Sequence, residues 1–161
     1  MSDRKGKRRF MEAALSEAYR GCSRGDGGPF GAVVVSKGEI VARGHNEVLK
    51  QGEPTRHAEM CAIAKAAPWF RSHLFLGASI YSTTEPCVMC FAAIHWARIR
   101  RVYFGTSVRD VNALGFNELT ISNRRLKALG RSPVEIVPGL LREECRELLE
   151  YWRRLPGKKT Y

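Results

Sequence analysis

The chain has 161 residues, a length typical of one domain rather than two. Hydrophobic residues make up 44% and charged residues 27%, which is ordinary for a globular protein and excludes wholesale disorder. No apolar run approaches the roughly 20 residues that a membrane-spanning helix needs. The basic start of the chain is not followed by the apolar segment of a secretory signal, so we expect a soluble, cytoplasmic protein.

The formal net charge of +11 has two interpretations. One is a nucleic-acid partner, because a basic surface attracts phosphates. The other is a solvated basic surface, which the distribution favours, since basic residues gather within residues 4–9 and 153–159. We expect a basic N-terminal tail over residues 1–8 and a C-terminal tail over residues 155–161.

Hydrophobic periodicity and turn residues divide the chain into alternating elements. Helices are predicted over residues 9–22, 57–67, 86–97, 122–129 and 141–154. Strands are predicted over residues 30–35, 39–44, 78–82, 101–105 and 134–137. Thr55 is a candidate cap for the second helix, and Pro68 is expected to stop it. A single domain over residues 1–161 is predicted, a three-layer α/β/α sandwich with a mixed central sheet.

Two segments carry the chemistry, and each lies where a predicted helix begins. The first is His57-Ala58-Glu59, and the second is Pro86-Cys87-Val88-Met89-Cys90. The two cysteines are three residues apart, so both face one point from the first turn of a helix. Together with the histidine they supply three ligands, which leaves one tetrahedral position open, as in catalytic zinc sites.

Glu59 lies two residues beyond the histidine, where a carboxylate can reach a water molecule on the metal without binding the metal. Zinc lowers the pKa of such a water to about 7, which makes hydroxide available near neutral pH. A Cys-x-x-Cys pair by itself also fits a redox site. A fourth ligand from His73 or His95 would instead make a structural zinc site. Neither alternative explains Glu59.

In combination, these motifs resemble those of the cytidine deaminase superfamily, and within it those of the small, dimeric guanine deaminases. The resemblance extends over nearly the whole chain. Outside the metal motifs it is carried by residues 27–33, 44–46, 96–98, 115–118 and 158–161. One departure is Asn117, where relatives usually have Asp, although Glu118 remains.

The resemblance implies that His57, Cys87 and Cys90 bind Zn²⁺ and that Glu59 is the proton shuttle, with Glu118 as a second catalytic carboxylate. It places substrate contacts on Phe30, Asn46, Ala58, Trp96, Glu118 and Tyr161. It also implies a small nucleobase substrate, the conversion of guanine to xanthine and ammonia, and a homodimer. Tyr161 is expected to close a pocket, that of the neighbouring subunit.

These roles have structural alternatives. Phe30 and Trp96 could instead pack in the core, and Asn46 could form an Asx turn. Glu118 could simply be exposed to solvent, and Tyr161 could belong to a frayed terminus. The function has alternatives as well: a tRNA adenosine-to-inosine deaminase, a deaminase of cytosine or a triazine, or a non-catalytic zinc protein that binds nucleic acid. The intact shuttle glutamate argues against the last of these.

Overall fold

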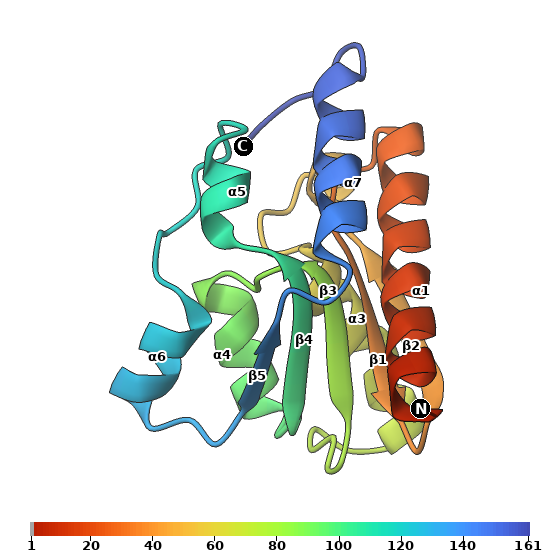
Figure 1. The fold of residues 1–161 in the computed structure, drawn as a ribbon, viewed down its shortest axis with the longest axis vertical. Helices are drawn as coiled ribbons and strands as arrows, with labels where there is room; N and C mark the ends of the chain where they lie inside the picture. The colour runs from red at the N-terminus through yellow and green to blue at the C-terminus, as the bar shows by residue number, and fades with distance from the viewer. Residues whose placement is uncertain (1) are drawn as a thin grey trace.

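The computed structural model describes residues 2–161, with side chains described from residue 5 onward. The helices are α1 (Ser2–Arg24), α2 (Val48–Gln51), α3 (Ala58–Phe70), α4 (Val88–Trp96), α5 (Val108–Asn112), α6 (Asn123–Gly130) and α7 (Arg142–Arg154). The strands are β1 (Gly31–Ser36), β2 (Glu39–His45), β3 (Ser79–Thr84), β4 (Arg101–Thr106) and β5 (Glu135–Pro138). Helices cover both faces of the sheet, which confirms the predicted three-layer α/β fold (Figure 1). In the described part of the chain, no helix combines the length and hydrophobicity that crossing a membrane requires.

The sheet is mixed, with the strand order β2-β1-β3-β4-β5. Strand β1 is antiparallel to both β2 and β3, so β2 and β3 run in the same direction. Strands β4 and β5 are parallel to β3. The segments that follow β2, β3 and β4 therefore leave the sheet at one edge, which is where α/β sheets place their ligands.

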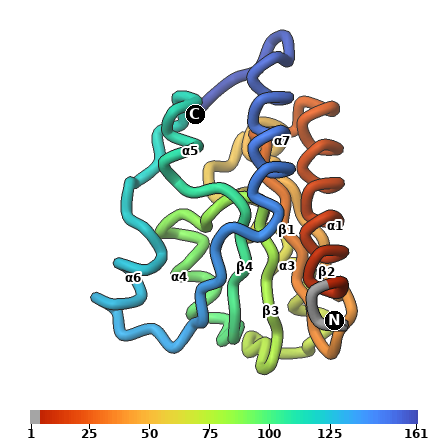
Figure 2. Tube along the Cα trace, in the orientation of Figure 1, coloured from red at the N-terminus to blue at the C-terminus, as the bar shows by residue number. Residues whose placement is uncertain are grey.

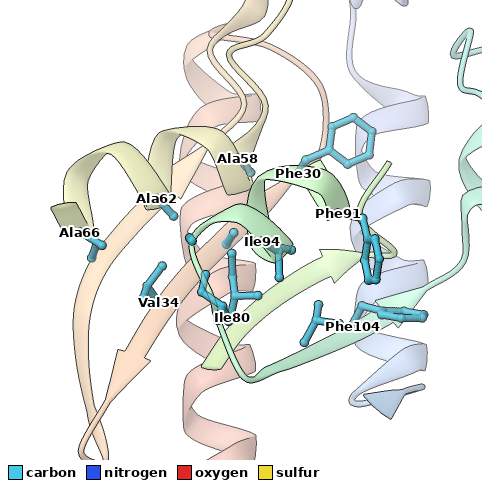
Figure 3. Close-up of a cluster of buried hydrophobic side chains, with 14 of the residues drawn as sticks. Phe30, Val34, Ala58, Ala62, Ala66, Ile80, Phe91, Ile94 and Phe104 are labelled. Atoms are coloured by element: carbon cyan, nitrogen blue, oxygen red, sulfur yellow. The ribbon is translucent and has the colours of Figure 1, made fainter. Parts of the chain in front are cut away.

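The pleat of the central strands sends alternate side chains into two separate cores. One core lies against α1 and α7, which run side by side over one face of the sheet (Figure 2), and it includes Val33, Tyr81 and Tyr103. The other core lies against α3 and α4 on the opposite face (Figure 3), and it includes Val34 and Ile80. Both helical layers are thus fixed by apolar contacts with the same strands.

The structure corrects the expected N-terminal tail. The basic residues from Ser2 onward belong to α1, which continues without a break to Arg24. Lys and Arg are good helix formers, so the amphipathic stretch extends into them rather than stopping at residue 9.

Two predictions at the ends of α3 are also corrected. His57, rather than Thr55, is the N-cap residue, and the Thr55 hydroxyl donates a hydrogen bond to Glu53. The helix passes through Pro68 and ends only where Arg71 adopts a left-handed conformation (φ 51°). A proline this close to the end of a helix removes one backbone hydrogen bond and leaves the preceding turns intact.

Candidate active site

Three metal-ligating side chains converge where α3 and α4 begin. His57 is the N-cap residue of α3, Cys87 is the N-cap residue of α4, and Cys90 lies in the first turn of α4. Their ligand atoms all lie within 4.8 Å of one another, and Nδ1 of His57 is 3.6 Å from Sγ of Cys87. One imidazole and two thiols at this spacing fit Zn²⁺, and they leave one tetrahedral position for a ligand from outside the protein.

Local backbone structure places two of these ligands. His57 (φ −66°, ψ 157°) and Cys87 (φ −64°, ψ 173°) are both extended residues directly before a helix. The His57 carbonyl accepts a hydrogen bond from Cys61 N at 2.9 Å, and the Cys87 carbonyl accepts one from Phe91 N at 2.8 Å. Each ligand is therefore held by the first hydrogen bond of its helix, at the end where the helix dipole favours negative charge.

Contacts among the three candidate ligands shift their pKa values. A hydrogen bond with Cys90 lowers the pKa of Cys87 to about 4, against the opposing effect of burial and with the help of His57. The same hydrogen bond, together with burial, raises the pKa of Cys90. Burial acts to lower the pKa of His57, but its hydrogen bond with Cys87 and the Cys87 charge produce a net rise. Zinc binding must therefore release protons from this group.

Glu59 stands beside this group without belonging to it. The residue lies in the first turn of α3 and is 6% exposed. Its Oε1 accepts a hydrogen bond from Ser82 Oγ at 2.7 Å. Burial, followed by the charge of Cys87, raises the pKa of the Glu59 carboxyl, which suits a group that must hold and release a proton. Ala58, fully buried, separates this carboxylate from the histidine ligand.

Sequence reasoning missed Ser82. Its hydroxyl fixes one oxygen of the Glu59 carboxylate from the neighbouring strand β3. A usable signal was present, because Ser82, Thr83 and Thr84 place three hydroxyl side chains in succession in a strand whose last five residues are buried. Buried hydroxyl groups require hydrogen-bond partners.

Asn46 follows β2 directly and is fully buried. Its Oδ1 accepts hydrogen bonds from Val48 N at 3.1 Å and from Gly28 N at 3.4 Å, so the Asx turn weighed from the sequence is present. These two bonds orient the amide and leave its Nδ2 buried with no hydrogen-bond partner in the described structure. A buried donor of this kind is unusual, and it is available to a ligand.

The C-terminal tail returns to its own chain, where the terminus lies close to α5 (Figure 1). The carbonyl oxygen of Tyr161 accepts a hydrogen bond from Asn117 N at 3.2 Å, and its ring packs edge-on against Phe116 with the centroids 5.3 Å apart. Burial raises the pKa of the Tyr161 phenol, which lies beside the Gly28 backbone and the Asn46 side chain. The terminus is therefore packed rather than frayed. In the structure of the single chain the tail packs on that same chain, and the closing of a neighbouring subunit's pocket by Tyr161 stays a prediction.

Two further predicted residues face the same site. Phe30 packs edge-on against Phe116 with the ring centroids 5.1 Å apart, and it belongs to the core against α3 and α4, so its core-packing interpretation is confirmed and its contact with a substrate stays a prediction. Glu118 is half-buried. Burial and the charge of Cys87 raise the pKa of Glu118, and the charge of His57 opposes this rise.

Trp96 is not brought to this site. It ends α4, roughly 13 Å along the helix from Cys87 at 1.5 Å per residue. Its side chain is 76% exposed, so it neither lines the pocket of this chain nor packs in the core. Helical geometry explains why Trp96 points away from Cys87. Trp96 lies four residues after Ala92, so both are on the same solvent-facing side of α4, and both are exposed.

A buried ionic network holds the loop that carries Asn46. The His45 side chain is 4% exposed, and its Nε2 lies 2.8 Å from Asp26 Oδ2 while its Nδ1 lies 3.3 Å from Glu17 Oε2. Glu47 pairs with Arg56 at 3.3 Å, directly before the histidine ligand. These contacts tie α1 to the loop between β2 and α3, which fixes the backbone on both sides of Asn46.

Comparison with known proteins agrees with this geometry. The family model described as the cytidine and deoxycytidylate deaminase zinc-binding region matches residues 4–106. The chain is 34% identical to guanine deaminase of Bacillus subtilis (strain 168), over 94% of this chain and 97% of that protein. It is also 34% identical to tRNA-specific adenosine deaminase of the same organism, over 93% of this chain and 91% of that protein. A solved structure of guanine deaminase from Nitrosomonas europaea has a TM-score of 0.83 at 28% identity, covering 92% of this chain and 85% of that chain.

The geometry predicts which substitutions remove the metal. His57→Ala deletes one of three ligands, so the purified protein should lose its zinc, whereas Glu59→Gln should retain about one zinc per chain because the carboxylate is not a ligand. Elemental analysis of exhaustively dialysed protein measures both. Loss of zinc from the Glu59→Gln variant would show instead that Glu59 binds the metal.

Proposed function

The chain belongs to the family of cytidine and deoxycytidylate deaminases with a zinc-binding region, and we propose that this hydrolytic deaminase converts guanine to xanthine and ammonia. The observation that carries the proposal is the position of Tyr161, whose ring packs on Phe116 and whose hydroxyl lies beside Asn46. A free base fits beneath such a cover. A base within a polynucleotide would need an open path for its sugar and phosphates.

Glu118 supports guanine as the base. The charges of Cys87, His57 and Glu59 all act on this carboxylate, so it faces the same site as the metal ligands. Guanine presents two donors, N1–H and the 2-amino group, next to the carbon under attack, whereas N1 of adenine is an acceptor. A carboxylate in this position binds the guanine edge and repels the adenine edge.

The remaining walls suit a flat ring with polar edges. Phe30 and Phe116 supply apolar surface of the kind against which a purine packs. The unpartnered Nδ2 of Asn46 supplies a donor for an acceptor atom of the ring. The unpartnered hydroxyl of Tyr161 lies beside it, so a bound base would complete hydrogen bonds that the protein leaves open.

The chain's own residues account for the proton transfers. Zinc, when bound to His57, Cys87 and Cys90, supplies a water molecule acidic enough to be a nucleophile near neutral pH. Glu59, held by Ser82 through one oxygen, accepts a proton from this water and delivers it to ring N3. It then carries a second proton to the departing amine. Burial of the site by Tyr161 excludes other water from the reaction.

A second candidate substrate is adenosine in tRNA, as in the tRNA-specific relatives. The observation that favours it is the net charge of +11, which would strengthen binding to a polyanion. The covered pocket and the placement of Glu118 favour the free base over this alternative.

The exposed face of α4 supports the expected homodimer. Ala92 and Trp96 are exposed on this otherwise apolar helix. We propose that a second copy of the chain covers this face, because aromatic residues such as Trp are enriched in protein interfaces relative to the rest of the surface. A zinc site built on thiolates fits a reducing compartment, and we place the enzyme in the cytoplasm.

Glu118→Ala should sharply reduce guanine deamination while leaving the zinc content normal. Loss of a polar contact on which a site is built can reduce turnover by a factor of about 10⁴. Ammonia release gives kcat/KM, with Glu143→Ala, an exposed carboxylate on α7, as the matched control and Glu59→Gln as the inactive reference. Unchanged guanine turnover in the Glu118→Ala variant would remove this carboxylate from base recognition.

Deletion of residues 157–161 should leave a folded, zinc-loaded protein with much lower activity on guanine, because the cover over the pocket is lost. Since the tail covers the site of its own chain, mixing this truncated chain with a Glu59→Gln chain should restore no activity. Each site in the mixed dimer would carry one defect. Restored activity would instead show that the tail crosses to the partner subunit.

A further inference from the structure

Glu85 is a buried carboxylate that takes no part in the proposed reaction. It follows β3, two residues before the ligand Cys87, and is 8% exposed. One of its oxygens, Oε2, accepts a hydrogen bond from Val108 N at 3.2 Å, and the other, Oε1, accepts one from Asn123 N at 2.8 Å. These two donors belong to the first residues of α5 and α6.

Val108 and Asn123 are the two ends of one segment of the chain. The residues between them, 109–122, include Phe116, which packs on Tyr161, and Glu118, on which the charges of Cys87 and His57 act. One carboxylate therefore holds both ends of the segment that lines the base site. Carboxylate acceptors make strong hydrogen bonds with backbone N–H groups, and two helix N-termini favour the negative charge at this place.

Two further hydrogen bonds tie the same turn to its surroundings. Asn123 Nδ2 donates to the Pro86 carbonyl oxygen at 2.6 Å, and Glu85 N donates to the Thr106 carbonyl oxygen at 2.8 Å. The turn that carries Cys87 is thus connected to β4, which precedes segment 108–123 in the chain, and to α6, which begins at the end of that segment. These connections join the Cys87 turn to both ends of the segment that contains Glu118.

We propose that Glu85 is a positioning residue for base recognition, which sets Glu118 relative to the zinc site by anchoring both ends of segment 108–123 to the Cys87 turn. The recognition part of this inference rests on the proposed function, because it takes Glu118 as the group that binds the guanine edge. The anchoring part concerns the protein alone, and it is measurable without any substrate.

The Glu85→Gln substitution tests the two hydrogen bonds of the Glu85 carboxylate. Glutamine has the same size, but its amide offers one acceptor oxygen and replaces the other with an N–H donor. That donor would face a backbone N–H, so one end of the segment is released while the other is kept. The zinc ligands are untouched, and the zinc content stays normal.

Hydrogen exchange on the zinc-loaded full chain tests the anchoring. In the Glu85→Gln variant, amides in segment 108–123 should exchange about tenfold faster than in the wild type, because a hydrogen bond to a charged group is lost. The control is Glu135→Gln, the same change at a half-buried carboxylate on β5 that pairs with Arg100 and Arg101 outside this segment, which should leave exchange in the segment unaltered. Unchanged exchange in a folded Glu85→Gln protein would overturn the proposal.

A second variant serves if Glu85→Gln does not fold. Glu85→Asp keeps the charge but is one methylene shorter, so its carboxylate cannot reach both Val108 N and Asn123 N. Faster exchange at one end of the segment supports the anchoring, and wild-type protection at both ends contradicts it.

A double-mutant cycle tests whether the anchor acts through Glu118. Glu85→Gln should raise KM for guanine about tenfold, with a smaller change in kcat, in the wild-type background. In the Glu118→Ala background it should have no further effect on KM. If the two substitutions instead raise KM by independent factors that multiply in the double variant, Glu85 does not act through Glu118 in base recognition. Absence of guanine turnover in the wild type would overturn the proposed function alone, and the exchange comparison would still decide the anchoring.

Discussion

The N-termini of α3 and α4 meet at one point, and the rest of the site depends on this meeting. Each helix begins at a metal ligand, His57 in one case and Cys87 in the other. The topology brings them together: β2 and β3 are both antiparallel to β1, so the segments that follow them leave the sheet at the same edge. Strand β4, parallel to β3, adds the segment that carries Glu118. Two helix dipoles then favour the thiolate and carboxylate charges that zinc chemistry requires.

Around this point the protein surrounds charged groups with fixed partners rather than with water. Ser82 holds Glu59, and two backbone N–H groups hold Glu85. Among the described residues, the buried polar atoms without a hydrogen bond of good geometry include Asn46 Nδ2 and the Tyr161 hydroxyl, and these two groups lie beside each other. The proposed function places the polar edge of the substrate at these two neighbouring groups. The metal ligands lie where α3 and α4 begin, whereas the proposed base contacts come from other segments of the chain.

The sequence was sufficient for the features that depend on local spacing. His57, Glu59, Cys87 and Cys90 lie within a few residues of two helix starts, and the three-layer fold follows from alternating elements. Contacts between residues far apart in the chain could not be predicted from the sequence. Glu85 reaches Asn123, 38 residues away, and the tail packs on its own chain. The predicted substrate contact of Trp96 has the same origin. A motif gives the identity of a residue, but it does not show whether the side chain points toward the site or, like that of Trp96, toward solvent.

Ammonia release by the zinc-loaded protein, supplied separately with guanine and with tRNA at several salt concentrations, tests the central claim most directly. A covered pocket that takes a free purine predicts release from guanine at a rate that changes little with salt, and none from tRNA. Release from tRNA that falls steeply with salt, as counterion release requires of a polyanion, with no ammonia from guanine, would contradict the account.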